Sequence, residues 1–365
     1  MFTDLDHLYM TRALQLAEQG LYSTSPNPRV GCVITSNNQI IGEGAHLKAG
    51  EPHAEVFALR QAGALAKGAT AYVTLEPCSH HGRTPPCADA LVQAGVAKVI
   101  IAMVDPNPLV AGKGLMYLQS HGIVTLSGLM TAQAQALNPG FISRMTLAKP
   151  FVRCKIAASL DGKTALENNQ SQWITSAAAR ADVQHWRARS CAIMTGIGTV
   201  LADNPTLNVR EIATARQPMR VVVDSQLQTP PDANILKHGA TLIAYAHDTH
   251  NKAPALLSAG AILLNIPNAD GQVCLHTLLA HLAREQFNEL MCEAGQGLNG
   301  ALVALGLVDE LLLYFAPKLM GGEAKSMFEM PSLTYMHQAL DLNIVDMRAL
   351  GKDIRIRAQI VKTAT

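Results

Sequence analysis

Two short stretches of sequence decide what the first part of the chain must be: PHAE over residues 52–55 and TLEPCSHHGRTPPC over residues 74–87. They contain one imidazole, His53, and two thiols, Cys78 and Cys87. One histidine and two cysteines fill three of the four tetrahedral positions of zinc and leave the fourth for water, as in a catalytic rather than a structural zinc site. Bound zinc lowers the pKa of that water towards about 7. Glu55 lies two residues from the histidine and could move protons without binding the metal.

Prolines before His53 and Cys87 predict that both ligands stand at the start of a helix. A helix N-terminus favours negative charge and therefore the thiolate. Residues two apart inside a regular helix point to nearly opposite sides, so His53 and Glu55 share one site only near the first turn. The alternatives are a closed zinc knot, with His80 or His81 as the fourth ligand, and a pair of buried cysteines. Glu55 and the prolines favour the catalytic interpretation.

Strands alternate with helices on both sides of this motif, which predicts an α/β layer with a partly parallel sheet. The expected elements are a helix capped by Thr3 and ending near Gly20, strands 30–35 and 40–43, helix 54–62, strand 71–75, helix 88–94, strand 99–104, helix 115–120, strand 123–126 and helix 131–137. Asn138-Pro139-Gly140 then interrupts the pattern. We place the domain boundary near residue 148, which divides the chain into domains 1–148 and 149–365.

The second domain again alternates strands and helices. Its clearest predicted strands are 151–156, 191–195, 221–224, 290–293, 311–315 and 354–360. Residues 295–300, GQGLNG, match G-x-G-x-x-G between a strand and a helix, where a phosphate can bind at the helix N-terminus. A Rossmann fold is a poor interpretation, because only 65 residues follow Gly300 and Asp309 and Glu310 come too early. A phosphate site and a structural turn both remain open here.

Length and composition limit the function classes. The chain has 365 residues, which suggests two domains, and 48% hydrophobic residues, enough for a buried core. Its net charge of +1 and 4% aromatic content argue against a nucleic-acid binder. The sequence has no stretch of about 18 apolar residues that could span a membrane. Its N-terminus has acids where a signal peptide has bases, and its number of cysteines is odd. We therefore expect a cytoplasmic protein without membrane contact. The cysteines expected to be small core residues are Cys32, Cys154, Cys191, Cys274 and Cys292.

The motif resembles the H-x-E…P-C-x-x-C signature of the zinc nucleobase deaminases. Eight residues separate the cysteines here, however, where that signature has two. The longer insertion resembles the deaminase half of the riboflavin-biosynthesis deaminase–reductases. The segment SPNPRVG over residues 25–31 is similar to the first substrate loop of that family. The resemblance implies a cytidine-deaminase-like three-layer domain in which Asn27 contacts the pyrimidine or ribose, with His46 a further candidate in the same pocket.

Five segments of the second domain resemble the reductase half of the same family. They are KIAASLDGKTA (155–165), WITS (173–176), GIGTVLADNPTLNVR (196–210), VVVDS (221–225) and EAG (293–295). The resemblance implies a dihydrofolate-reductase-like α/β domain that uses NADPH. The implied NADP contacts are Ala157, Trp173, Thr199, Asp203, Ser225, Gly295, Gln296, Gly297, Leu298, Asn299, Gly300 and Ala301. The implied substrate contacts are Ser171, Arg187, Leu207, Arg210 and Glu293, with Lys155 and Glu293 also implied in catalysis.

The family implies two consecutive reactions. The first is zinc-dependent hydrolytic deamination of 2,5-diamino-6-ribosylamino-4(3H)-pyrimidinone 5′-phosphate, with Glu55 as the proton carrier. The second is NADPH-dependent reduction of the ribosyl side chain to ribityl, in which Arg187 and Arg210 suit the phosphate. The expected partner is this small phosphorylated pyrimidine, and the chain is expected to be a homo-oligomer. Two alternatives stay open: a polynucleotide or free-nucleobase zinc deaminase fused to an uncharacterised dinucleotide-binding domain, and a zinc-stabilised binding module with a degenerate reductase domain.

Overall fold

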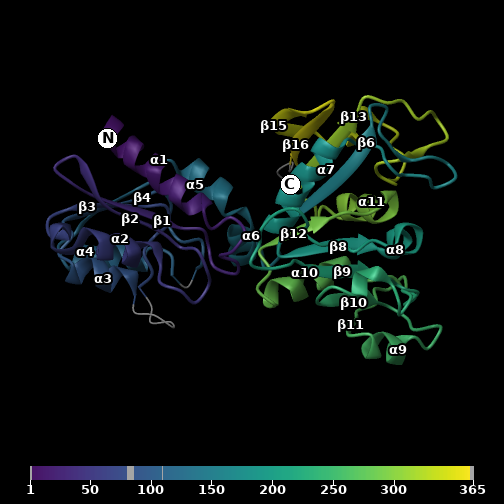
Figure 1. Ribbon diagram of the computed structural model, residues 1–365, viewed down its shortest axis with the longest axis horizontal. Helices are drawn as coiled ribbons and strands as arrows, with labels where there is room; N and C mark the ends of the chain where they lie inside the picture. Colours follow the sequence, from purple (N-terminus) through teal and green to yellow (C-terminus); the bar gives the residue numbers. More distant parts are fainter. Residues whose placement is uncertain (1, 80–85, 109, 362–365) are drawn as a thin grey trace. The chain divides into compact units, whose positions relative to one another are not determined.

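The computed structural model describes residues 2–79, 86–108 and 110–361, and its contacts form two compact units, Met1–Ala148 and Lys149–Thr365 (Figure 1). In the described part of the first unit, the strands form a five-stranded sheet in the order β2-β1-β3-β4-β5. Strand β1 is antiparallel to β2 and β3, whereas β3, β4 and β5 are parallel. The strands are β1 (Gly31–Ser36), β2 (Gln39–Ala45), β3 (Thr70–Val73), β4 (Lys98–Ile101) and β5 (Val124–Ser127).

Helices cover both faces of this sheet. Helices α1 and α5 lie on one face, and α2, α3 and α4 lie on the other (Figure 1). The helices are α1 (Asp4–Glu18), α2 (Ala54–Ala62), α3 (Cys87–Gln93), α4 (Lys113–Ser120), α5 (Thr131–Leu137) and α6 (Pro139–Leu147), with a 3-10 turn at Gly63–Ala66. The predicted cap of α1 is confirmed, because Thr3 and Asp6 exchange backbone and side-chain hydrogen bonds.

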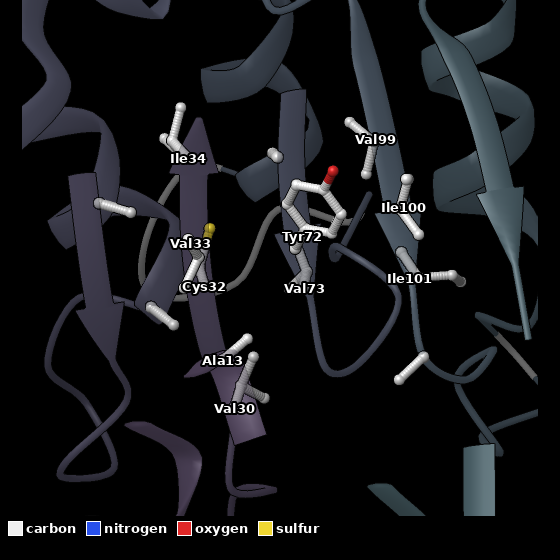
Figure 2. Close-up of a cluster of buried hydrophobic side chains, with 14 of the residues drawn as sticks. Ala13, Val30, Cys32, Val33, Ile34, Tyr72, Val73, Val99, Ile100 and Ile101 are labelled. Carbon is white, nitrogen blue, oxygen red and sulfur yellow. The ribbon is translucent and has the colours of Figure 1, made fainter. Parts of the chain in front are cut away.

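Each central strand contains a continuous apolar run, because it is buried on both faces, and its polar residues lie at or next to one end. Figure 2 shows side chains from β1, β3 and β4 standing on the sheet, including Ile34, Tyr72 and Ile100, and all of them are buried. A strand between two helical layers cannot alternate apolar and polar residues, because each face is covered. This explains the continuous hydrophobic runs in the sequence.

Glycines in β2 bring α2 close to the sheet. A Cβ atom added to Gly44 would lie 2.0 Å from the Ala54 carbonyl oxygen, and one added to Gly42 would lie 2.2 Å from the Ala58 carbonyl oxygen. Helix α2 therefore packs directly against the β2 backbone. This contact fixes the helix start that carries His53 and Glu55.

The described second unit contains a nine-stranded sheet in the order β11-β10-β9-β8-β12-β6-β13-β16-β15. In this order, the first seven strands, which begin with β11 and end with β13, are parallel to one another. Strand β16 is antiparallel to β13, and β15 is antiparallel to β16. The strands are β6 (Phe151–Ser159), β8 (Ala192–Gly196), β9 (Met219–Val223), β10 (Thr241–Tyr245), β11 (Ala261–Asn265), β12 (Glu289–Cys292), β13 (Glu310–Ala316), β15 (Leu342–Leu350) and β16 (Asp353–Ile360), with β7 (Lys163–Ala165) and β14 (Lys325–Ser326) paired separately.

Two hydrophobic clusters cover the two faces of the large sheet. Successive residues of β8 point to opposite faces, so Ala192 and Met194 belong to one cluster and Ile193 belongs to the other. The first cluster includes residues of α10 (Leu275–Arg284) and α11 (Gln296–Ala304), and the second includes residues of α7 (Ala177–Arg189), α8 (Ile197–Asp203) and α9 (Ala253–Ser258). Two 3-10 turns occupy Asn234–Leu236 and Met336–Gln338. None of the described helices is long and apolar enough to span a membrane.

The prediction for the cysteines is wrong at one position. All seven cysteines belong to the described residues and none forms a disulfide. Cys32, Cys154, Cys191 and Cys292 are buried, as expected for small core residues. Cys274 is only half-buried, because it precedes the first residue of α10 and its Sγ accepts a hydrogen bond from the Thr277 hydroxyl.

A buried charged network crosses the second unit. The Arg153 side chain is 1% exposed and binds Glu289 at 3.2 Å and Glu310, while its guanidinium lies 4.7 Å from the Trp186 ring centroid. Arg189 also binds Glu289. These hydrogen bonds offset the desolvation of the charges, so removal of Arg153 leaves two buried carboxylates that share fewer cations, Glu289 with Arg189 and Glu310 with Arg357.

We expect Arg153→Met to destabilise this unit by about 3–5 kcal/mol, because Glu289 and Glu310 lose their central counter-ion. Urea unfolding followed by tryptophan fluorescence measures this, since both tryptophans of the chain, Trp173 and Trp186, belong to the second unit. The control is Arg348→Met, whose exposed ion pair should contribute less than about 1 kcal/mol. Equal shifts in the two variants would contradict the expectation.

Candidate functional site

Three predicted ligands converge at one edge of the first sheet. His53 is the residue before α2, Cys87 is the first residue of α3, and Cys78 follows β3. Their ligand atoms all lie within 4.8 Å of one another, and His53 Nδ1 lies 3.2 Å from Cys87 Sγ and 3.6 Å from Cys78 Sγ. Zinc bonds of about 2.0 Å to nitrogen and 2.3 Å to sulfur can span such separations. The donor set and its spacing therefore fit a tetrahedral zinc with one position left for another ligand.

The thiols are arranged so that one of them is readily deprotonated. A hydrogen bond from the Cys87 thiol, outweighing burial, lowers the pKa of Cys78 to about 4. The backbone N–H of Cys87 also donates to Cys78 Sγ at 3.3 Å. A thiolate is the form that binds a metal. His80 and His81, the alternative fourth ligands of a closed knot, lie outside the described residues.

Glu55 is buried beside the cluster, in the first turn of α2. Burial, together with the negative charge of Cys78, raises the pKa of Glu55 to about 7. Its Oε2 atom has no hydrogen-bond partner among the described residues. A carboxyl group with a pKa near neutrality can both accept and donate a proton at pH 7. The free oxygen is therefore suited to a reacting water or substrate.

Asn27 is connected to the cluster through His46. Asn27 Nδ2 lies 3.0 Å from His46 Nε2, and His46 Nδ1 lies 3.2 Å from the Pro52 carbonyl oxygen. The His46 and His53 rings are 5.1 Å apart between centroids. Because a carbonyl can only accept, Nδ1 carries the proton and Nε2 accepts from the Asn27 amide. This leaves the Asn27 carbonyl oxygen available for a ligand.

A cavity of about 1350 Å³ opens in the second unit among the carboxyl ends of its parallel strands. Ligand pockets usually measure about 300–1,000 Å³, so this cavity has room for a dinucleotide and a second small molecule. The predicted site residues that line it are Lys155, Ala157, Ser171, Trp173, Arg187, Thr199, Asp203, Leu207, Arg210, Ser225, Glu293, Gly295, Gln296, Gly297, Leu298 and Ala301.

Two predicted cofactor residues face elsewhere. Asn299 is buried, and its side-chain amide donates to the Ala294 carbonyl oxygen at 3.0 Å. A Cβ atom added to Gly300 would lie 2.0 Å from the Glu329 carbonyl oxygen, so this glycine permits close packing of α11. Neither residue lines the cavity. The start of α11 thus presents Gly295 to Leu298 to the cavity, and Asn299 and Gly300 support it from behind.

Glu293 forms ion pairs with two cationic side chains inside the cavity, Arg187 and Lys155. Arg187 donates from Nε to Glu293 Oε1 at 2.7 Å and from Nη2 to Oε2 at 3.1 Å, and Lys155 Nζ lies 3.4 Å from Oε2. Burial opposes ionisation, but the charges of Arg187 and Lys155 outweigh it and lower the pKa of Glu293 to about 2. Arg187 Nη1 also donates to the Asn208 carbonyl oxygen. Arg187 therefore orients Glu293, and its contact with the substrate stays a prediction.

Two further residues of α7 were missed in the sequence. The Arg180 guanidinium lies 4.5 Å from the Trp173 ring centroid, and Gln184 Oε1 accepts from the Arg210 backbone N–H at 2.9 Å. Both line the cavity together with Arg187. Positions 180, 184 and 187 share one face of a helix, so helical periodicity counted back from Arg187 could have identified them.

Comparison with known proteins agrees with this arrangement. Residues 3–103 match the family model of the cytidine and deoxycytidylate deaminase zinc-binding region, and residues 150–356 match the RibD C-terminal domain. The riboflavin biosynthesis protein RibD of Escherichia coli (strain K12) is 49% identical over 362 residues, covering 96% of this chain and 98% of that protein. The predicted order, a cytidine-deaminase-like three-layer domain followed by a dihydrofolate-reductase-like α/β domain, is confirmed.

Solved structures extend this similarity to the whole chain. Acinetobacter baumannii RibD, form 1, is 47% identical, with a TM-score of 0.91 over 98% of this chain and 99% of that one. A diaminohydroxyphosphoribosylaminopyrimidine deaminase/5-amino-6-(5-phosphoribosylamino)uracil reductase from Thermotoga maritima is 28% identical, with a TM-score of 0.87 over 98% of this chain and 99% of that one. The chain therefore belongs to the RibD family of riboflavin biosynthesis proteins, in which a zinc-binding deaminase domain precedes a reductase domain.

Proposed function

We propose that the chain catalyses two consecutive reactions of riboflavin biosynthesis. The first is the hydrolytic deamination of 2,5-diamino-6-ribosylamino-4(3H)-pyrimidinone 5′-phosphate, and the second is the NADPH-dependent reduction of the ribosyl side chain to ribityl. The observation that carries the proposal is the presence, in one chain, of a His-Cys-Cys cluster beside an unpaired Glu55 oxygen and of a large cavity containing Lys155 and Glu293.

In the deaminase unit, His53, Cys78 and Cys87 would hold zinc. Zinc, when bound, would lower the pKa of a water molecule and so supply hydroxide at neutral pH. Glu55 accepts one proton of the attacking water and passes it to the ring nitrogen. It then takes the proton of the new hydroxyl group as the carbonyl forms, and passes this second proton to the amino group, which leaves as ammonia. The Asn27 carbonyl oxygen accepts a hydrogen bond from the pyrimidine or ribose, since its amide nitrogen is engaged by His46.

In the reductase unit, the cavity would hold NADPH with its phosphates near the start of α11, where Gly295 and Gly297 leave the backbone accessible. The nicotinamide supplies the hydride that reduces the ribose carbon. Lys155 is the proton donor, and the Glu293 carboxylate holds its ammonium in place. Arg210 is exposed at the cavity and free to approach the substrate phosphate.

We expect ammonia release to precede NADPH consumption when the purified chain receives the diaminopyrimidine. A chelator should abolish ammonia release and leave NADPH oxidation on deaminated substrate intact, because the metal-ligand cluster found among the described residues lies in the first unit. NADH in place of NADPH tests the cofactor preference. Loss of both activities on chelation, or of neither, would contradict the assignment of two sites. The homo-oligomer and the cytoplasmic location stay predictions.

A further inference from the structure

One asparagine holds the loop that carries Asn27. Asn138 is the single residue between α5 and α6, and it is 2% exposed. Its Oδ1 accepts from the Arg29 backbone N–H at 2.8 Å, and its Nδ2 donates to the Arg29 carbonyl oxygen at 2.9 Å. The amide thus pairs with both polar groups of one residue, as a neighbouring strand would. A helix break needs no such pairing, since Pro139 alone ends the preceding helix.

The same part of the chain holds the loop at a second point. Arg144, in α6, donates from Nη2 to the Pro26 carbonyl oxygen at 3.1 Å. The Arg29 guanidinium also reaches back, donating to the carbonyl oxygens of Leu137 and Leu21. Residues 137–144 therefore bind the loop on both sides of Asn27. The two hydrogen bonds between the Asn138 amide and the Arg29 backbone are buried, whereas those of the Arg144 and Arg29 guanidinium groups are partly buried.

The loop is in turn joined to the metal ligands. Asn27 Nδ2 lies 3.0 Å from His46 Nε2, and the His46 ring packs against the ring of His53. A shift of the loop backbone therefore displaces the Asn27 carbonyl oxygen relative to the metal site. Displacements of about 1 Å in positioning groups are enough to reduce activity substantially.

We propose that Asn138 is a positioning residue of the deaminase, which acts by fixing the Arg29 backbone and so presenting Asn27 to the substrate. The inference rests on the substrate contact proposed for Asn27. Asn138 itself touches neither the metal ligands nor the substrate. Its loss should weaken substrate binding more than it slows the chemical step.

The test compares deamination by Asn138→Ala, Asn27→Ala and the double variant. We expect each single change to raise KM for deamination about tenfold, the change that loss of about 1.4 kcal/mol produces, with kcat within about twofold. The double variant should be no worse than Asn27→Ala, because Asn138 acts through that residue. Zinc content and NADPH oxidation on deaminated substrate should stay at the wild-type values, which a general loss of folding would lower.

Thr131→Val is the matched control. It removes one partly buried hydrogen bond at the start of α5, from the Thr131 hydroxyl to the Ala102 carbonyl oxygen. This change does not touch the loop that carries Asn27, and KM should be unchanged. If Asn138→Ala does not fold, Arg144→Met tests the second attachment and should raise KM about threefold. Suppose that Asn27→Ala raises KM as expected. A wild-type KM in Asn138→Ala, or a KM in the double variant that combines the two single increases, would then overturn the inference. An Asn27→Ala variant with wild-type KM would instead overturn the proposed substrate contact, and this inference with it.

Discussion

Replacement of Glu55 by glutamine is expected to lower kcat for deamination by a factor of about 10²–10⁴, the usual contribution of a general acid–base group. Glutamine keeps the size of the side chain but cannot accept a proton from the attacking water. Glu55 is a buried carboxyl group beside the His-Cys-Cys cluster and is not one of its metal ligands. Its pKa of about 7, raised by burial, suits a group that must take up and return a proton at neutral pH.

Zinc content separates this loss from a loss of metal. The variant should hold as much zinc as the wild-type chain, because His53, Cys78 and Cys87 are unchanged. NADPH oxidation on deaminated substrate should also be unchanged. Glu18→Gln, at the exposed end of α1, is the control for the removal of one carboxylate from the same unit. A Glu55→Gln chain that released ammonia at the wild-type rate would rule out Glu55 as the proton carrier.

The metal cluster could be predicted because its signals are local. A proline before each ligand and the spacing of His53, Cys78 and Cys87 are visible in two short stretches, and two of the ligands, His53 and Cys87, stand at helix starts. The family resemblance added the second unit, whose cavity is lined by most of the residues it implied. Local signals and a family pattern together therefore identified both reactions.

The contacts that connect distant segments could not be predicted. The substrate contact implied for Arg187 stays a prediction, but its pairing with Glu293, which lies 106 residues further along the chain, was not expected. The pairing of Asn138 with Arg29 spans 109 residues, and nothing beside Asn138 indicates it. Strand β15 was missed because most of its residues are exposed on both faces, which removes the alternation that identifies a strand. Tertiary neighbours decide all three features.

Replacement of Glu293 by glutamine is expected to lower kcat for the reduction about 100-fold or more. The amide retains the size of the side chain but cannot neutralise Lys155 and Arg187, so the ammonium loses the group that holds it in the cavity. With a pKa of about 2, Glu293 is ionised at every pH at which the enzyme would be assayed, so it acts as an anion and not as the proton donor.

The sign of the pH dependence follows from the same lowered pKa. Stabilisation by ionised Glu293 is complete above its ordinary value of 4.5 and is lost as the pH falls towards about 2. The acid limb of the reduction rate between pH 5 and 7 should therefore be the same in the wild-type chain and in Glu293→Gln, although the rate of the variant is lower throughout.

Steady-state NADPH oxidation on deaminated substrate measures the effect, with ammonia release by the same sample as the internal control. Glu285→Gln, an exposed position after α10, is the matched variant and should behave as wild type. Lys155→Met should reproduce the loss, and the double variant should be no slower than Lys155→Met, because Glu293 acts through the ammonium group. Wild-type reduction by Glu293→Gln would show that Lys155 needs no counter-ion, and wild-type reduction by Lys155→Met would show that the proton donor is another residue of the cavity.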